Sequence, residues 1–313
     1  MALPCTLLRN WLTKSLLMRI ISLLPSATEI LFELGLGDQL VGVTFECDFP
    51  AEAKSKRIVS TSALPENLSP GEIDAIVKER MADGEDLYKL DRGAFADLDP
   101  DIVITQDLCA VCAVDVSEVD DALGFLSCNA EVITLDPMSL DEVIESISTV
   151  AARTDTETLA DSLKAELRKR LEAVASKVEG AEAPRVVVLE WTDPAFTAGH
   201  WVPDLVVAAG GRSMLGRPGE NSVGVEWDAI RDCGADIVIV SPCGFRLDGA
   251  SELGEQVLAT GVLPAEAEVW AVDADAFMVR PGPRVVEGVE VLSAILHPEA
   301  CGAPDPEKAR KLR

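Results

Sequence analysis

Short apolar runs alternate with helical patterns along most of this 313-residue chain, and that alternation restricts the folds open to it. In the first half, strand-like runs occupy residues 19–25, 41–45, 102–107 and 131–135. Helical patterns such as 70–80 and 140–152 lie between them. Because strands that alternate with helices are typical of βαβ units, the sequence predicts an α/β fold with a parallel sheet covered by helices.

The second half repeats the alternation. Strand-like runs occupy residues 185–191, 236–242 and 269–273, and helical patterns occupy 203–209 and 280–296. The hexapeptides Asp-Pro-Asp-Ile-Val-Ile at 99–104 and Gly-Ala-Asp-Ile-Val-Ile at 234–239 hold equivalent places in the two halves. A single core rarely grows beyond about 250–300 residues, so we expect two lobes.

A long helix is predicted between the halves, from Thr156 to Val178. Its apolar residues recur at spacings of four and three, at Leu159, Leu163, Leu167, Leu171, Val174 and Val178. Such a stripe is typical of a helix with one buried face. About 23 residues at 1.5 Å each span roughly 35 Å, enough for one backbone helix to join two lobes, although an ordinary surface helix has the same pattern.

These patterns predict the following domain organisation. Residues 1–18 form a leader or an artificial extension, 19–153 the N-terminal lobe, 154–180 the linking helix, 181–297 the C-terminal lobe, and 298–313 a polar, disordered tail. Within the first lobe, Ser26 is expected to cap a helix with Glu29 in a capping box, and Gly35 to help end it.

The charge balance restricts the partners. The chain has 54 acidic and 27 basic side chains and a net charge of -27, which repels nucleic-acid phosphates and anionic lipids. No run reaches the roughly 18 apolar residues that a membrane span requires. We therefore expect neither nucleic-acid binding nor membrane insertion.

The first 18 residues contain Arg9 and Lys14, no acid, and no long apolar run of the kind a secretory signal needs. Either Met18 is the true start, or these residues form a short basic organellar presequence. Export is not supported, and the sequence predicts a cytoplasmic protein.

Several segments resemble the helical-backbone (class III) substrate-binding proteins, a family with an iron/cobalamin periplasmic-binding domain. They are SLLPSATEILFELGLGDQLVGV at 22–43, FADLDPDIVI at 95–104, DLVVAAGG at 204–211, VEWDAIRDCGADIVIVSP at 225–242 and RPGPRVVEGVEVLSAIL at 280–296. The phrases FECDFP, DLCAVC, AGHWVPD and SPCGF look most like a leaderless, cobalamin-binding subgroup. The resemblance covers roughly residues 19–297.

The resemblance implies a binding protein, not an enzyme, that holds a corrinoid (cobalamin-like) or related metal chelate in a cleft between the lobes. Intracellular sequestration or delivery is the expected role. Exported members of the family dock on a permease through one glutamate of each lobe. Gly93 and Trp227 align with those glutamates, and Glu226 is adjacent to the second, so a permease partner is doubtful. A transporter component is the third alternative.

Ligands of parallel α/β sheets lie beyond the carboxyl ends of the strands. The residues that follow those ends, and that we expect to bind the ligand, are Pro25, Ser26, Phe45, Glu46, Asp107, Trp191, His200, Trp201, Phe245, Phe277 and Arg280. The helix that begins near Pro25 can accept an anionic group, and the aromatic rings can cover a flat macrocycle or pack in the core. His200 either ligates cobalt or iron or is a hydrogen-bonded loop residue. Arg280 either neutralises an acidic ligand group or caps a helix.

Four cysteines also follow predicted strands: Cys47, Cys109, Cys112 and Cys243. Four thiolates from three loops can hold zinc or an iron–sulfur cluster, or offer sulfur to cobalt. A buried cysteine is also an ordinary small hydrophobic residue. The alternative function is therefore a cysteine-dependent metal or iron–sulfur protein on the same fold, with an enzyme among the roles left open. The sequence has no catalytic motif, so no catalytic residue is predicted.

Overall fold

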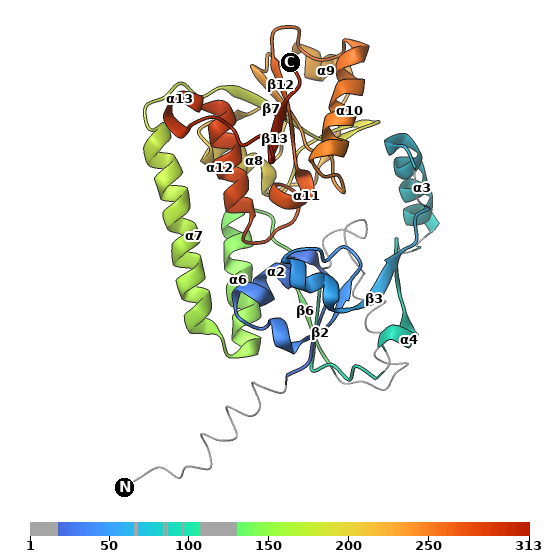
Figure 1. The fold of residues 1–313 in the computed structure, drawn as a ribbon. Helices are drawn as coiled ribbons and strands as arrows, with labels where there is room; N and C mark the ends of the chain where they lie inside the picture. Colours follow the sequence, from blue (N-terminus) through green and yellow to red (C-terminus); the bar gives the residue numbers. More distant parts are fainter. Residues whose placement is uncertain (1–17, 66–67, 84, 86, 96, 107–129) are drawn as a thin grey trace. The chain divides into compact units, whose positions relative to one another are not determined.

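A computed structural model describes residues 18–65, 68–83, 85, 87–95, 97–106 and 130–313 (Figure 1). The chain divides into two compact units. Unit 1 comprises the residues up to Leu68, Ala75–Asp136 and Ser146–Leu163, and unit 2 comprises Ser69–Asp74, Pro137–Glu145 and Lys164–Arg313.

Unit 1 is built on a mostly parallel sheet. Its strands are β1 (Ile20–Ser22), β2 (Leu40–Thr44), β3 (Arg57–Ser62), β4 (Tyr88–Leu90), β5 (Ile102–Thr105) and β6 (Glu131–Thr134), in the order β4-β3-β2-β1-β5-β6. Neighbouring strands are parallel except for the antiparallel pair β3 and β4. The helices α2 (Pro25–Glu33), α3 (Pro70–Asp83), α4 (Arg92–Phe95) and α6 (Leu140–Thr154) separate these strands or follow them.

Unit 2 has a mixed sheet with a parallel centre. Its strands are β7 (Arg185–Thr192), β8 (Ala195–Thr197), β9 (Arg212–Ser213), β10 (Val223–Gly224), β11 (Ile237–Val240), β12 (Glu268–Val272) and β13 (Ala309–Lys311). The order is β10-β8-β7-β11-β12-β13, and β9 also pairs with β7. Its helices are α8 (Val202–Ala208), α9 (Trp227–Asp232), α10 (Leu247–Thr260), α11 (Ala274–Phe277), α12 (Val285–Leu296) and α13 (Pro298–Cys301). The α/β fold with two helix-flanked sheets is confirmed.

The long helix predicted over Thr156–Val178 is α7 (Glu157–Val178), and its buried stripe differs from the prediction at one end. Leu159 is 51% exposed, whereas Ala160, Leu167 and Val174 are buried. These three residues lie seven apart, two turns of a helix, so the inward face passes through Ala160.

Helix α7 folds back along α6 after a turn at Asp155, which has a φ of +57°. Lys164 Nζ lies 3.1 Å from Glu145 Oε2, and Arg168 pairs with Asp141 and Glu145. Figure 1 shows the two helices side by side. The boundary between the two units falls inside both helices.

The start of α2 differs from the expected capping box. Leu24 is the N-cap residue, Pro25 occupies the first turn, and no side chain caps the helix. Ser26 is buried, so the proline rather than the serine marks the helix start. The helix ends as predicted near Gly35, whose φ is +73°.

The expected disordered tail is wrong. Residues 298–313 contain α13 and the strand β13, which pairs antiparallel with β12. Leu312 N donates to Val269 O at 2.8 Å, and Lys311 Nζ lies 2.8 Å from Glu268 Oε1. The polar composition fits an edge strand, whose backbone pairs with β12 on one side only.

The duplicated hexapeptides form β5 and β11 and the residues just before them. In unit 1, Arg19 N donates to Asp101 Oδ2 at 2.8 Å, and in unit 2 Arg185 N donates to Asp236 Oδ2 at 2.8 Å. Each aspartate thus ties the start of its strand to the start of the neighbouring parallel strand, β1 or β7. Among the helices of the described residues, none is long and apolar enough to cross a membrane.

We predict that Asp236→Ala lowers the free energy of unfolding by about 1 kcal/mol at neutral pH. The pKa of Asp236 is lowered chiefly by its hydrogen bonds with Arg185, so its stabilisation is present above the unfolded pKa and is lost as the pH falls through the folded value. Urea unfolding measures the difference. Glu255→Ala, which removes an exposed carboxylate, is the control; an equal loss in both variants contradicts the prediction.

Candidate functional site

The parallel strands β7, β11 and β12 end together at one edge of the unit 2 sheet, which we call the unit 2 edge. Cys243 N donates to Glu190 O at 3.0 Å, and Ser241 Oγ donates to Val272 O at 3.4 Å. These bonds join the ends of all three strands. Ligands of parallel α/β sheets bind at such an edge.

Trp191 and Phe245 form an aromatic pair at this edge. Their ring centroids are 5.9 Å apart with an interplanar angle of 59°. The Trp191 Nε1–H donates to Asp193 O at 3.0 Å and Pro70 O at 3.3 Å. Because the indole N–H is already bonded, Trp191 offers a ligand its apolar ring and not a polar donor.

His200 lies in the loop before α8 with a φ of +51°. Its Nε2 is 3.2 Å from Asn221 Oδ1, and its ring centroid is 5.7 Å from that of Trp201. Burial lowers the pKa of His200 below its usual value, although the hydrogen bond to Asn221 opposes that shift. The lowered pKa favours the neutral imidazole, which is the form that coordinates a metal ion.

Glu190 is a site residue that the sequence interpretation missed. Protein atoms crowd its carboxyl group, although part of the residue remains accessible to water, and this burial raises its pKa to about 7. Ser222 Oγ and the Gly199 backbone N–H donate to the carboxyl and oppose the shift. The available signal was a single carboxylate in the otherwise apolar strand segment Val-Val-Val-Leu-Glu-Trp.

Arg280 lies close to an acid within the same unit. Its Nη2 is 3.5 Å from Asp275 Oδ2, and both side chains are largely buried. Burial raises the pKa of Asp275, and the charge of Arg280 opposes that shift. The positive charge predicted to neutralise an acidic ligand group thus faces a carboxylate of the protein itself.

Trp201 and Phe277 are packed in unit 2. Trp201 is 6% exposed, and its Nε1–H donates to Met278 O at 2.8 Å. Phe277 is 8% exposed, and Lys308 Nζ lies 5.9 Å from the centroid of its ring. These contacts support the core alternative for both rings, and their stacking on a ligand stays a prediction.

The other predicted site residues lie in unit 1. Pro25 and Ser26 are buried at the start of α2, and Phe45 is 39% exposed with its ring centroid 6.0 Å from that of Tyr88. Tyr88 Oη donates to Glu46 Oε2 at 3.2 Å. Asp107 lies outside the described residues. Phe45 and Glu46 thus follow β2 together, as the strand pattern predicted.

The cysteines divide between the units. Cys47 is buried in unit 1, with its Sγ 3.0 Å from Thr28 Oγ1, and Cys243 is exposed in unit 2. Cys109 and Cys112 lie outside the described residues. Within the described part of the chain, no group of three or more His, Cys, Asp or Glu side chains can hold a metal ion. The metal and iron–sulfur proposals gain no support there.

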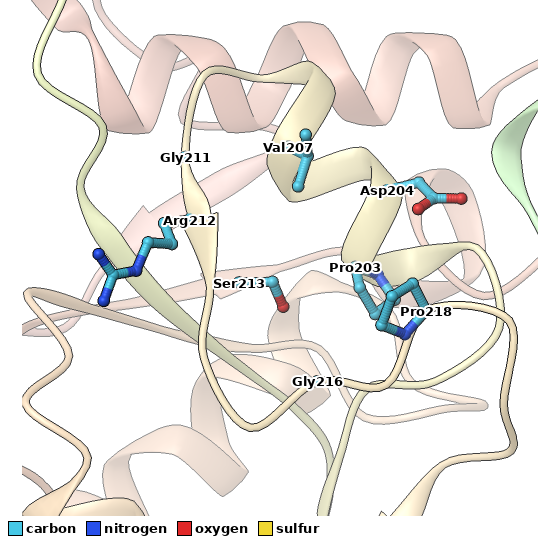
Figure 2. A pocket seen from close by; sticks show the side chains of 8 residues that line it. All are labelled: Pro203, Asp204, Val207, Gly211, Arg212, Ser213, Gly216 and Pro218. Atoms are coloured by element: carbon cyan, nitrogen blue, oxygen red, sulfur yellow. The ribbon is translucent and has the colours of Figure 1, made fainter.

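A cavity of about 260 Å³ lies elsewhere in unit 2 (Figure 2). Its lining residues are Pro203, Asp204, Val207, Gly211, Arg212, Ser213, Gly216 and Pro218. On one side of the cavity, β9 pairs with Arg185 and Val186 at the start of β7. None of the lining residues directly follows β7, β11 or β12.

Comparison with known proteins identifies the family. The sequence profile of the family described as periplasmic binding protein matches residues 20–268. The chain belongs to the periplasmic binding protein family. A cobalamin-binding protein of Halobacterium salinarum (strain ATCC 29341 / DSM 671 / R1) is 26% identical over 287 residues, which are 89% of this chain and 69% of the relative.

A second relative and a solved structure are also similar to this chain. The uncharacterized ABC transporter substrate-binding lipoprotein YvrC of Bacillus subtilis (strain 168) is 25% identical over 296 residues, 90% of this chain and 80% of the relative. A periplasmic heme binding protein from Pseudomonas aeruginosa has the same fold, with a TM-score of 0.67, 18% identity and 95% of each chain covered. The resemblance to substrate-binding proteins is confirmed, and this periplasmic binding protein is a solute-binding protein and not an enzyme.

The titration of Glu190 predicts that stability falls as the pH rises through about 7. The folded pKa of about 7 exceeds the ordinary 4.5, so the folded state holds the proton more tightly. The resulting stabilisation is complete below the unfolded pKa and is lost above the folded one. Its upper limit is about 3 kcal/mol, reduced by the remaining solvent contact.

Thermal unfolding at about pH 5.5 and about pH 8.5 measures this effect. The fall in melting temperature should be larger for the wild type than for Glu190→Gln, which cannot ionise. Equal falls in the two proteins would mean that Glu190 does not titrate in this range.

Proposed function

We propose that this periplasmic binding protein binds a corrinoid. The observation that carries the proposal is the aromatic pair of Trp191 and Phe245 at the unit 2 edge; His200, whose pKa is lowered by burial, belongs to a loop of the same unit. A corrin ring is large and flat, and apolar ring faces bind such a surface by stacking and by excluding water. The cobalamin-binding relative from Halobacterium salinarum supports the same ligand class.

The charges at the unit 2 edge favour a corrinoid over haem. Haem carries two anionic propionates, whereas the side chains of a corrin ring end in neutral amides. Arg280 already faces Asp275, and the carboxylates of Asp193 and Asp273 lie at the same edge. Burying propionates against these carboxylates costs free energy unless cations pair with them.

Titration with cobalamin, cobinamide and hemin, followed by absorbance and calorimetry, tests the proposal. We expect both corrinoids to bind with dissociation constants of roughly tens of micromolar or less, and hemin to bind more weakly. Failure of both corrinoids to bind, or tighter binding of hemin, would overturn the proposal.

Trp191→Ala is expected to weaken corrinoid binding by at least about tenfold, since it removes a stacking surface. Trp270→Ala is the matched control, because Trp270 lies within β12 and its Nε1–H donates to Glu268 Oε2 at 3.0 Å, within the same strand. Equal affinities in the two variants, both folded by circular dichroism, would remove Trp191 from the site.

A second candidate function is delivery of the ligand to an ABC transporter permease. The name of the Bacillus subtilis relative favours it, and the doubt raised by Gly93 and Trp227 gains no support from the comparisons. The predicted cytoplasmic location instead favours sequestration of the ligand inside the cell. Cell fractionation with sequencing of the mature N-terminus separates the two: a processed, exported form favours the transporter, and an unprocessed cytoplasmic form favours sequestration.

A further inference from the structure

The loop that carries His200 has two arms, residues 199–200 and 219–222, and their backbones cross and bond to each other. His200 N donates to Glu220 O at 2.6 Å, and Gly219 N donates to His200 O at 3.0 Å. A Cβ at Gly199 would lie 2.4 Å from Ser222 N and 2.5 Å from Glu220 O. Only glycine therefore fits at this crossing, and the two arms approach as closely as backbones can.

Glu190 lies beneath this crossing, on an irregularity of β7. The pairing of β7 with β8 shifts register between Leu189 and Trp191, so Glu190 is the bulged residue. A bulge redirects a side chain and is common beside functional sites. Here the bulged residue is Glu190, and its carboxyl group is directed towards the loop that carries His200.

The carboxyl of Glu190 accepts one hydrogen bond from each arm of the loop. Gly199 donates its backbone N–H from the first arm, and Ser222 donates its hydroxyl from the second. The neighbours of these two donors are His200 and Asn221, whose side chains bond to each other at 3.2 Å. The carboxyl therefore ties residues 199–200 to residues 221–222, the two short segments that contain His200 and its partner Asn221.

The backbone of His200 needs such support. Its φ of +51° lies in the left-handed region, which a residue other than glycine keeps only where its surroundings hold it. The next residue, Trp201, is fixed by its bond to Met278 O at 2.8 Å, and its ring centroid is 5.7 Å from that of the imidazole. Glu190 acts on the residue before the histidine and Met278 on the residue after it.

We propose that Glu190 is a positioning residue, which holds the crossed loop so that His200 keeps its orientation at the unit 2 edge. That His200 then meets a ligand rests on the proposed function. The positioning itself does not, and it is open to a test without any ligand.

Proton NMR of the imidazole C2–H resonances provides that test, because the chain contains only two histidines. His297, whose Nε2 is 3.1 Å from Gly210 O, is the internal control, and a His297→Asn variant assigns the two signals. In Glu190→Ala the loop should loosen, so the lowered titration midpoint of His200 should rise towards its usual value while the chemical shift of the His297 C2–H signal at a fixed pH stays as in the wild type.

Glu190→Gln should rescue the wild-type midpoint. Its amide oxygen can accept from Gly199 N–H and its amide nitrogen can donate to Ser222 Oγ, so both arms stay bonded. Ser222→Ala, which releases one arm only, should give an intermediate shift and serves if Glu190→Ala does not fold. An unchanged His200 midpoint in the folded alanine variants, or a shift in Glu190→Gln as large as in Glu190→Ala, overturns the proposal.

Ligand titration separates this inference from the proposed function. With cobinamide as the probe, Glu190→Ala should bind about tenfold more weakly than the wild type and Glu190→Gln within about threefold. If no corrinoid binds the wild type, the proposed function fails while the NMR result still decides the positioning. If corrinoid binding is the same in all variants although His200 moves, Glu190 positions a residue that the ligand does not use.

Discussion

The parallel pairing of β7, β11 and β12 is the constraint on which the candidate site depends. Parallel strands all end at one edge, so Trp191 near the end of β7 and Phe245 and Arg280 after β11 and β12, although far apart in the sequence, belong to strand ends of the same sheet. Asp236 fixes the opposite end by bonding to the backbone of Arg185. The equivalent bond from Arg19 to Asp101 in unit 1 indicates that both halves set the register of their central strands in the same way.

The antiparallel strand β8 adds what the parallel strands lack. Because β7 pairs with β11 on one side and with β8 on the other, the chain reverses sharply after Thr192, and the register shift at Glu190 accompanies that reversal. The shift turns a carboxyl towards Ser222, 32 residues further along the chain. A single irregularity in one strand thus connects the sheet to the loop that contains His200.

The sequence predicted the fold well because its evidence is local. Runs such as Val186–Leu189 are apolar at every position, as strands buried on both faces must be, and the helix α7 was found within one residue of its start. The errors concern elements stabilised by distant partners. The polar strand β13 exists because β12 offers it an open edge, and Ala160 rather than Leu159 faces inward because the neighbouring helix decides the buried side.

The sequence predicted which residues lie at the candidate site, but not the charge states of their side chains. Strand ends gave Trp191, His200 and Arg280, yet nothing in the sequence shows that Arg280 faces Asp275 or that burial lowers the pKa of His200. These local effects matter because the whole chain has a net charge of -27. At the unit 2 edge Arg280 faces an acid and burial lowers the pKa of His200, while Asp193 and Asp273 place carboxylates directly after β7 and β12. Burying an anionic group of a ligand against these carboxylates costs free energy unless cations pair with it, so the acidity of the chain bears on the charge of the ligand that this edge can accept.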